Sequence, residues 1–449
     1  MVRLCLFFFL FLFCYSFGYC QVTPEQFGAH GDGISDDTEA FIKALNEDKN
    51  VLLTQKYRIK ALEIPSNKKI FGTNSSAIIY YDIIVNSNVK IEGVLFDGEW
   101  STKGVHIIGS NVSIINCKFI NTKGVLEAYG GLTATIWIGQ FSDLSLKMTK
   151  YHNITIDHCI FDGCTPFANK RNGNENSTVA RFILSYCCDY LNISNCSFFN
   201  LFGTIDSDAI HISGYEINTR DTPFYSRSDK WIGNSPPYKG YVYSSCNVTI
   251  ENCYFVQKDC KSSIKIMSSG VIIKNNTFDI RNSGTAGSSY SVVRVHYAKD
   301  ISIIKNSFNY VEGDIESIIK IGIGSRVKVV YNNVWSKNSN QNGIIKTILN
   351  CAYSADVLIK KNKCILTSLE SLLYTEFNHS LRIINNELSI WGDLHNLYGD
   401  IGNHYTYPVS KPEGKILFKG NTINCEYPLL KYNKSEYPVS CKNNHISLF

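Results

Sequence analysis

The chain has 449 residues, of which 44% are hydrophobic and 13% aromatic, and its formal net charge at pH 7 is only +5. The apolar content suffices for a large buried core, while so small a charge gives no reason to expect a nucleic-acid partner. The length would allow two or three domains of average size, but one motif repeated along the chain predicts a single elongated domain.

Residues 1–20 predict a secretory signal peptide. They carry one arginine and the apolar run Leu4–Phe13, followed by small residues before an expected cleavage between Gly18 and Gln21. The apolar run is too short to span a membrane. A lipid anchor at Cys20 is the alternative, although the tyrosine before it is unfavourable for that modification. We therefore expect a secreted, periplasmic or cell-surface protein.

Residues 27–40, which read F-G-A-H-G-D-G-I-S-D-D-T-E-A, come soon after the signal. The glycines permit tight turns, and Asp36 followed by Glu39 is a capping pattern for a helix whose apolar face includes Phe41. We expect this helix to form an N-terminal cap over residues 22–50, because the first coil of a repeat structure otherwise exposes its core.

The same stretch closely resembles the F-G-A-x-G-D-G-x-x-D-D-T-x-A signature that opens the polygalacturonases and related pectate-lyase-like proteins, which include polysaccharide lyases, uronate epimerases and phage tailspikes. The resemblance implies an all-β right-handed parallel β-helix and is silent about the reaction. It makes Asp32, Asp36 and Asp37 architectural rather than catalytic.

Residues 247–255, N-V-T-I-E-N-C-Y-F, contain a motif that recurs along the chain. Two β-branched residues alternate with polar ones, Asn-Cys interrupts the alternation, and a phenylalanine resumes it. This pattern predicts a strand, a bend and a second strand. Eleven copies share the register, and they begin at Val89, Val112, Ile154, Leu191, Val248, Val271, Ile301, Val327, Val357, Leu381 and Ile416.

The spacing of the copies predicts a solenoid. Val89 and Val112 are 23 residues apart, whereas Leu191 and Val248 are 57 apart. A fixed minimum with a variable excess is expected when each coil needs the same strands but its turns grow freely. We expect about 10–12 coils over residues 51–425, followed by a C-terminal cap over 426–449 that lacks the repeat register.

The residue at the bend changes along the chain. We interpret this column as a cysteine stack followed by an asparagine ladder, because asparagine tolerates left-handed backbone angles and its amide can bond to the next asparagine. Such ladders resemble those of pectate-lyase-type β-helices; a leucine-rich-repeat solenoid is the alternative, but its leucine spacing is absent. The column contains Cys117, Cys159, Cys196, Cys253, Asn276, Asn306, Asn332, Asn362, Asn386 and Asn421.

Each coil must also carry a third strand between copies of the motif. If the isoleucines and valines of these strands point inward, alternation places a row of polar and aromatic residues outward on one face. Asp206, Asp208 and Asp259 lie near the middle of this row. The row forms a groove suited to an acidic polysaccharide or oligosaccharide, unless these are simply charged solvent-facing positions. Its predicted members are Trp137, His211, Lys265, Arg294, His296, Lys320 and Lys346.

Two long excursions interrupt the repeat, at residues 162–180 and 214–245. The second combines aromatic and cationic side chains, among them Tyr225, Arg227 and Trp231, which suit sugar stacking and carboxylate pairing. The alternative is a loop packed by its own aromatic residues.

The outward row permits a lyase. β-Elimination on a uronic acid requires a cation for the carboxylate and a base for the adjacent proton, roles that lysine, arginine or histidine can fill. Lys265 on one coil and Arg294 on the next resemble the arrangement in the chondroitinase and alginate lyase family. That family binds calcium through acids before the lysine. Here only Asp259 precedes it, at a different offset, so calcium is the one suggested cofactor and its ligand set is incomplete.

The row also permits a hydrolase, which needs an acid and a carboxylate base. Asp206 with Asp208, then Asp259, then Arg294 with His296 resemble the successive motifs of polygalacturonases, but the G-H-G motif is absent. We therefore rank β-elimination on a uronate-containing glycan ahead of glycoside hydrolysis, with a non-catalytic glycan-binding or structural β-helix as the third possibility. No metal site is predicted.

Overall fold

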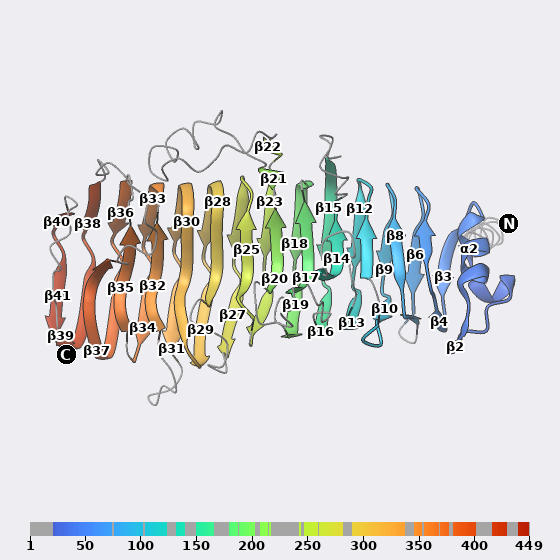
Figure 1. Ribbon diagram of the computed structural model, residues 1–449, viewed down its shortest axis with the longest axis horizontal. Coiled ribbons are helices and arrows are strands. Elements are labelled where there is room, and N and C mark those ends of the chain that lie inside the picture. The colour runs from blue at the N-terminus through green and yellow to red at the C-terminus, as the bar shows by residue number, and fades with distance from the viewer. Residues whose placement is uncertain are drawn as a thin grey trace, which may run out of the picture.

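The computed structural model describes residues 21–73, 76–101, 104–123, 132–139, 150–165, 179–186, 188–202, 207–213, 215–216, 242–243, 247–258, 260–281, 290–336, 345–352, 354–367, 369–376, 380–400, 415–428 and 439–448. These residues form a rod of stacked coils, with the N-terminal helix at one end and the last strands at the other (Figure 1). The protein is mostly β and its main strands pair in parallel, which is the right-handed parallel β-helix expected from the sequence.

Each coil contributes a strand to each of three parallel sheets. In one coil β23 (Val248–Glu251) belongs to sheet 1, β24 (Tyr254–Gln257) to sheet 2 and β25 (Ser262–Met267) to sheet 3. The next strand, β26 (Val271–Lys274), then pairs with β23 in register, so Val248 lies beside Val271. Successive copies of the motif therefore stack directly on one another.

Sheet 1 contains β1 (Gln21–Val22), β3 (Asn50–Leu53), β6 (Lys69–Gly72), β9 (Lys90–Glu92), β12 (Val112–Ile115), β15 (Tyr151–Asp157), β18 (Cys188–Ser194), β23, β26, the later parts of β28 (Ser291–Ile304) and β30 (Ile315–Val330), β33 (Ala355–Lys360), β36 (Ser380–Ile384), β38 (Lys415–Lys419) and β40 (Val439–Lys442). Sheet 2 contains β2 (Asp32–Asp36), β4 (Lys56–Arg58), β7 (Ala77–Ile79), β10 (Leu95–Asp97), β13 (Lys118–Thr122), β16 (Ile160–Cys164), β19 (Ser197–Leu201), β24, β27 (Thr277–Arg281), β29 (Ser307–Glu312), β31 (Asn333–Ser336), β34 (Lys363–Leu366), the first part of β37 (Glu387–Asp400), β39 (Thr422–Pro428) and β41 (His445–Leu448).

Sheet 3 contains β5 (Leu62–Ile64), β8 (Asp82–Val85), β11 (Gly104–Ile107), β14 (Leu132–Ile138), β17 (Val179–Tyr186), β20 (Asp208–Ser213), β25, the first parts of β28 and β30, β32 (Ile345–Ala352), β35 (Leu369–Glu376) and the later part of β37. A separate antiparallel pair joins β21 (Tyr215–Glu216) to β22 (Val242–Tyr243).

The inward side chains of the three sheets form one continuous apolar core. Within it the phenylalanine of successive motif copies forms a column of stacked rings, with neighbouring centroids 4.6–5.1 Å apart. The spacing matches the rung distance of a sheet, so each ring covers the next. The column consists of Phe96, Phe119, Phe161, Phe198, Phe255, Phe278 and Phe308.

The asparagine ladder is present as predicted. The Asn332 side-chain oxygen accepts bonds from the backbone and side-chain nitrogens of Asn306, at 2.9 and 3.0 Å. Its amide nitrogen donates to the Ile303 carbonyl at 2.9 Å and to the next rung, Asn362, at 2.9 Å. The same connections run from Asn276 to Asn421 and on to Asn444. Buried backbone polar groups at every bend are thereby satisfied.

The bend differs from the prediction in one respect. The ladder residues do not adopt the left-handed backbone angles; the residue before each of them does, as at Asn275 (φ 56°) and Asn385 (φ 53°). Lys305, Tyr331 and Lys361 occupy the same position with φ between 54° and 59°. The ladder asparagines are therefore selected for their amide hydrogen bonds, and the turn itself is made one residue earlier.

The N-terminal helix, α2 (Thr38–Asn46), lies at the end of the rod (Figure 1). Its buried face includes Phe41, which belongs to the common core and contacts the Tyr57 ring edge-on at 5.7 Å. Asp36 accepts hydrogen bonds from the backbone N–H and the hydroxyl of Thr38. Asp37 accepts hydrogen bonds from the backbone N–H groups of His30 and Gly31. A short 3-10 helix, η1 (Pro24–Phe27), precedes it.

At the opposite end the repeat continues past the segment where the sequence analysis expected it to stop. β40 pairs with β38, with Ile416 beside Val439, and β41 pairs with β39. Asn444 also accepts the last described ladder bond from Asn421, at 2.9 Å. The expected absence of repeat register after residue 425 is therefore wrong, because these strands lack the full motif but keep its asparagine and its pairing.

The cysteine side chains of the core are buried, among them Cys117, Cys159, Cys164, Cys196, Cys253, Cys351 and Cys364. The stack formed by Cys117, Cys159, Cys196 and Cys253 occupies the ladder column in the first half of the rod, where the Cys196 thiol donates to the Ser194 carbonyl at 3.1 Å. Burial raises the pKa of the thiols of Cys164, Cys351 and Cys364 to about 12, so they are poor nucleophiles.

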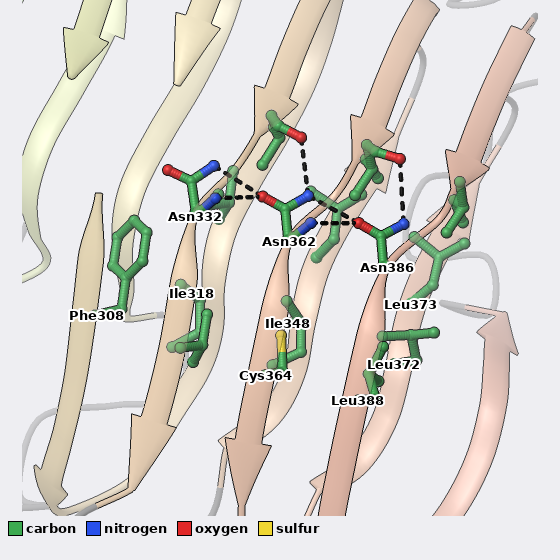
Figure 2. Close-up of a pocket in the computed structure, with 16 residues that line it drawn as sticks. Phe308, Ile318, Asn332, Ile348, Asn362, Cys364, Leu372, Leu373, Asn386 and Leu388 are labelled. Atoms are coloured by element: carbon green, nitrogen blue, oxygen red, sulfur yellow. Dashed lines mark hydrogen bonds between the residues drawn. The ribbon is translucent and has the colours of Figure 1, made fainter. Parts of the chain in front are cut away.

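The phenylalanine column ends at Phe308, and a cavity of about 40 Å³ lies beyond it. Val334, Cys364 and Leu388 continue the column with smaller side chains. Figure 2 shows Cys364 and Leu388 below the amides of Asn332, Asn362 and Asn386, with Phe308 at one side. The cavity is enclosed by core residues, so it is a packing defect rather than a ligand site.

We expect Cys364→Val to raise the free energy of unfolding by about 0.5–1 kcal/mol, because the added volume fills part of this cavity at about 24 cal/mol per Å³. Chemical denaturation would measure the change. The matched control is Cys351→Val: Cys351 is equally buried but does not line the cavity, so overpacking should destabilise the protein there. Equal effects at the two positions would contradict the explanation.

Candidate functional site

The outer face of sheet 3 carries one row of side chains drawn from successive coils. Backbone pairing places Leu184 beside His211, His211 beside Lys265, Lys265 beside Arg294, and Arg294 beside Lys320. Trp137 precedes Leu184 in the same row. Residues more than 180 positions apart in the sequence are thus aligned because every coil repeats the same strand in register.

Four predicted members of the row are buried, although we expected their side chains to lie in solvent. The exposed fractions are 5% for Trp137, 5% for His211, 7% for Lys265 and 8% for Arg294. Every residue of β20 is buried, and all but the last of β25, so both faces of these strands are covered. Side-chain alternation gives the direction of a residue but not what covers it, which is why the sequence could not reveal the burial.

Asp208 is the centre of the charged part of the site. Its carboxylate is fully buried and accepts a hydrogen bond from the Ser262 hydroxyl. Arg181 Nε and His211 Nδ1 lie 3.7 and 3.5 Å from Asp208 Oδ2. Backbone pairing of β17, β20 and β25 places Arg181, Asp208 and Ser262 side by side. A buried carboxylate of this kind requires such partners.

The cluster holds Asp208 charged and His211 neutral. Burial alone would raise the pKa of Asp208, but the nearby His211 imidazole and the charges of Lys265 and Arg181 outweigh it, so this pKa lies below its usual value. Burial, reinforced by the Arg181 charge, lowers the pKa of His211 to about 3. His211 is therefore an uncharged imidazole at neutral pH, with Nδ1 turned to a carboxylate.

This pKa shift predicts acid sensitivity. The unfolded chain binds a proton at His211 near pH 6.5, and the folded chain binds it only near pH 3, so stability should fall as the pH drops from 6.5 toward 3. The depressed pKa of Asp208 adds a loss of the same sign below its unfolded value. We expect His211→Gln to flatten this dependence in denaturation measured from pH 3 to 7. An unchanged slope would show that His211 is not held neutral.

Lys320 and Lys346 differ in position. Lys320 lies in the row, where its ammonium is 2.8 Å from a Glu316 carboxylate oxygen that also accepts a bond from Asn350. Lys346 is exposed and outside the row, because Lys320 pairs with Asn350 on β32. The prediction that Lys346 belongs to the row is therefore wrong: β32 extends beyond residue 347, and the row crosses it at Asn350, four residues after Lys346.

His296 lies two residues after Arg294 on β28, beside Gly322 of the next coil. The glycine makes room for the imidazole, because a Cβ on Gly322 would come within 2.9 Å of His296 Nδ1. The ring is half-buried and points to the same side as Arg294.

The other end of the row is aromatic. His106 on β11 stacks on Trp137 with ring centroids 4.4 Å apart, and Tyr186 meets the Trp137 ring edge at 6.4 Å. The Gly139 carbonyl lies 2.7 Å from His106 Nε2, while burial lowers the pKa of His106. The outer face thus changes from aromatic to charged along the rod.

Three residues of the site were not predicted from the sequence: Arg181, Glu316 and His106. His106 stands in G-V-H-I, which has the same alternation as the strand of His211, so the pattern could have revealed it. Arg181 precedes an apolar run and gave no such signal. Asp206, Asp259, Tyr225, Arg227 and Trp231 lie outside the described residues, as do the signal peptide and most of both excursions.

Within the described ranges there is no group of three or more His, Cys, Asp or Glu side chains arranged to hold a metal ion. Nor does that part of the chain include a helix long and apolar enough to cross a membrane.

Comparison with known proteins gives one sequence relative. No protein-family model matches the chain. A capsule K30/K69-specific depolymerase of Klebsiella phage K64-1 is 41% identical over 227 residues, which is 40% of this chain and 27% of the relative. The chain therefore spans only about a quarter of the length of that protein.

Solved structures share the architecture at low sequence identity. The A-module of the mannuronan C-5 epimerase AlgE6 from Azotobacter vinelandii matches 94% of this chain and 98% of its own, with a TM-score of 0.56 and 12% identity. A tailspike mutant of E. coli bacteriophage HK620, in complex with a hexasaccharide, matches 94% of this chain and 78% of its own, with a TM-score of 0.51 and 9% identity. Together with the three parallel sheets, these matches show that the chain has the right-handed parallel β-helix fold.

Proposed function

We propose that the chain is an extracellular or surface enzyme that acts on a uronate-containing polysaccharide by β-elimination. The observation that carries the proposal is the buried Asp208–His211 pair beside Lys265 and Arg294 in one row. The partial sequence match to a phage capsule depolymerase supports a polysaccharide as substrate. The tailspike and epimerase likenesses are of fold alone.

The proposed reaction needs a base, which is His211, and cations, which are Lys265 and Arg294. His211, neutral and oriented by Asp208, takes the C5 proton of a uronate residue, while Lys265 and Arg294 neutralise its carboxylate. The electron pair of the C–H bond forms the C4–C5 double bond, and the C4–O bond breaks. The leaving oxygen takes up a proton, so the products are an unsaturated uronate end and a new reducing end.

An anionic substrate would also make His211 a stronger base. The free imidazole has a pKa of about 3 because burial and the Arg181 charge disfavour its protonated form. A carboxylate bound beside Lys265 brings a negative charge into the cluster and stabilises that form. The base is thus strengthened only when a uronate is in place.

Glycoside hydrolysis has less support. It requires an acid with a raised pKa as well as a carboxylate base. Asp208 is instead ionised and paired with Arg181 and His211. Asp206 and Asp259 are the other candidate acids predicted from the sequence, and the elimination mechanism assigns neither of them a role.

The reaction can be tested with a panel of acidic polysaccharides, including capsular polysaccharides, alginate and polygalacturonate. Elimination produces ultraviolet absorbance from unsaturated uronates together with new reducing ends. Reducing ends without that absorbance would mean hydrolysis, and binding without either product would mean a non-catalytic protein. Either result would refute the proposed reaction.

We expect Lys265→Met to reduce the elimination rate at least about 100-fold, because a buried cation that faces the substrate carboxylate is lost. The matched control is Lys320→Met in the same row. Lys320 is already neutralised by Glu316 at 2.8 Å, so its loss should cost much less. Thermal denaturation must accompany both assays, because Lys265 is 7% exposed and its removal also alters packing. Equal rate losses at the two positions would contradict the assignment.

A further inference from the structure

Two aromatic side chains are exposed at the corner where sheet 2 leads into sheet 3. Trp100 follows β10 and Phe202 follows β19, and their ring centroids are 6.4 Å apart. Their exposed fractions are 39% and 45%. Because β13 and β16 lie between β10 and β19, the two side chains meet along the length of the rod. We call these two residues, with Asp97 and Asp162, the aromatic platform.

The backbone that presents Trp100 is strained. Glu99 and Trp100 are consecutive non-glycine residues with left-handed φ angles of 46° and 56°. The Trp100 N–H donates to the Asn121 carbonyl at 2.7 Å, and Arg58 makes two 2.8 Å bonds to the Glu99 carboxylate. Strain of this kind persists only where its surroundings hold it, and it concentrates at ligand-binding sites.

The indole of Trp100 also packs against the backbone of Gly163. A Cβ on Gly163 would lie 2.9 Å from Cη2 of Trp100, so the six-membered ring rests on glycine backbone that any side chain would obstruct. Gly163 itself has a φ of 83°, which favours glycine at this position. The ring is therefore fixed in place while more than a third of the residue stays open to solvent.

Carboxylate–amide pairs border the platform. Asp97 accepts a hydrogen bond from the Asn121 amide at 3.0 Å, and Asp162 accepts one from the Asn200 amide at 2.7 Å. Asp97 and Asp162 occupy the same outward row of sheet 2, two rungs apart. Carboxylates that keep acceptor capacity beside an aromatic face suit the hydroxyl groups and apolar C–H face of a sugar. The same carboxylates would repel a uronate.

We propose that the aromatic platform binds a neutral, hydroxyl-bearing sugar residue of a polysaccharide. This inference rests on the proposed function and extends it. The cationic row of sheet 3 takes the uronate, and the platform takes a neutral sugar of the same chain. The substrate is therefore a heteropolysaccharide that contains both kinds of residue, rather than a polymer of uronates alone.

Affinity gel electrophoresis can test this with hyaluronan and gellan as heteropolysaccharides, and alginate and polygalacturonate as polyuronates. We expect Trp100→Ala to weaken the retention of the protein by a heteropolysaccharide about tenfold and to leave retention by polyuronates unchanged. The matched control is Trp335→Ala, because Trp335 is also on sheet 2 and is 37% exposed. It should change neither.

Three results would overturn the platform: retention unaffected by Trp100→Ala, an equal loss with Trp335→Ala, or no retention of the unaltered protein by either heteropolysaccharide. An equal loss of polyuronate binding would overturn its preference for a neutral sugar. The comparison should be repeated with His211→Gln, in which cleavage should be about 10²–10⁴-fold slower. If that variant cleaves at the unaltered rate, the proposed reaction fails, while the difference in retention between the unaltered protein and Trp100→Ala still tests the platform.

Discussion

Replacement of His211 by glutamine is expected to lower the rate of polysaccharide cleavage about 10²–10⁴-fold, the usual contribution of a general base. Glutamine occupies similar space and can still bond to Asp208, but it cannot accept the substrate proton. The loss should appear in kcat more than in KM, because the lost interaction belongs to the transition state. Initial rates of unsaturated-uronate formation would measure it.

His106→Gln is the matched control for this experiment. His106 stands in the same outward row and is half-buried, but it stacks on Trp137 and lies beside the Gly139 carbonyl rather than a carboxylate. We expect its replacement to change the rate less than about tenfold. If both variants are equally impaired, or if His211→Gln retains activity, His211 is not the base.

The largest effect on stability is expected from Asn332→Ala in the middle of the ladder. The substitution leaves the Asn306 N–H and the Ile303 carbonyl buried without their partners. Each unsatisfied buried group costs about 1–3 kcal/mol, so the loss from these two groups should be about 2–6 kcal/mol. Urea denaturation would measure it, with the yield of folded protein as the first indication.

Asn309→Ala provides the comparison for Asn332→Ala. The Asn309 amide donates to Asp279 at 2.9 Å, but it lies on the outer face of sheet 2, where water can replace the bond. We expect a loss of only about 0.5–1.5 kcal/mol there. Similar losses at the two positions would mean that the ladder contributes no more than an ordinary side-chain hydrogen bond.

Much of the fold could be predicted because its information is local and repeated. The alternation around Arg294, in Val293-Arg294-Val295, is enough to separate inward from outward residues, and the same pattern in neighbouring coils aligns them. The asparagine column could be predicted equally well, because asparagine recurs at the same position in successive copies of the motif. Both features depend on strand periodicity, which sequence reports directly.

The site was less predictable because its properties arise between coils. Arg181 and Asp208 meet through the pairing of β17 with β20, and neither residue carries a motif of its own. The burial of Lys265 depends on what covers sheet 3, which strand alternation does not encode. The predicted place of Lys346 in the row was wrong for a simpler reason. The length of β32 decides which residue of that strand lies in the row, and the ends of strands are poorly marked in a sequence.

The asparagine ladder has a direction. Each side-chain oxygen accepts hydrogen bonds from the asparagine of the preceding coil. Each side-chain amide nitrogen donates one to the asparagine of the following coil, as far as Asn444. A whole turn inserted into this half of the molecule would find the same donors and acceptors above and below it. The architecture is thus modular, and its length can change by duplication or deletion of single turns beyond Asn332, while the row of Lys265, Arg294 and Lys320 keeps its register.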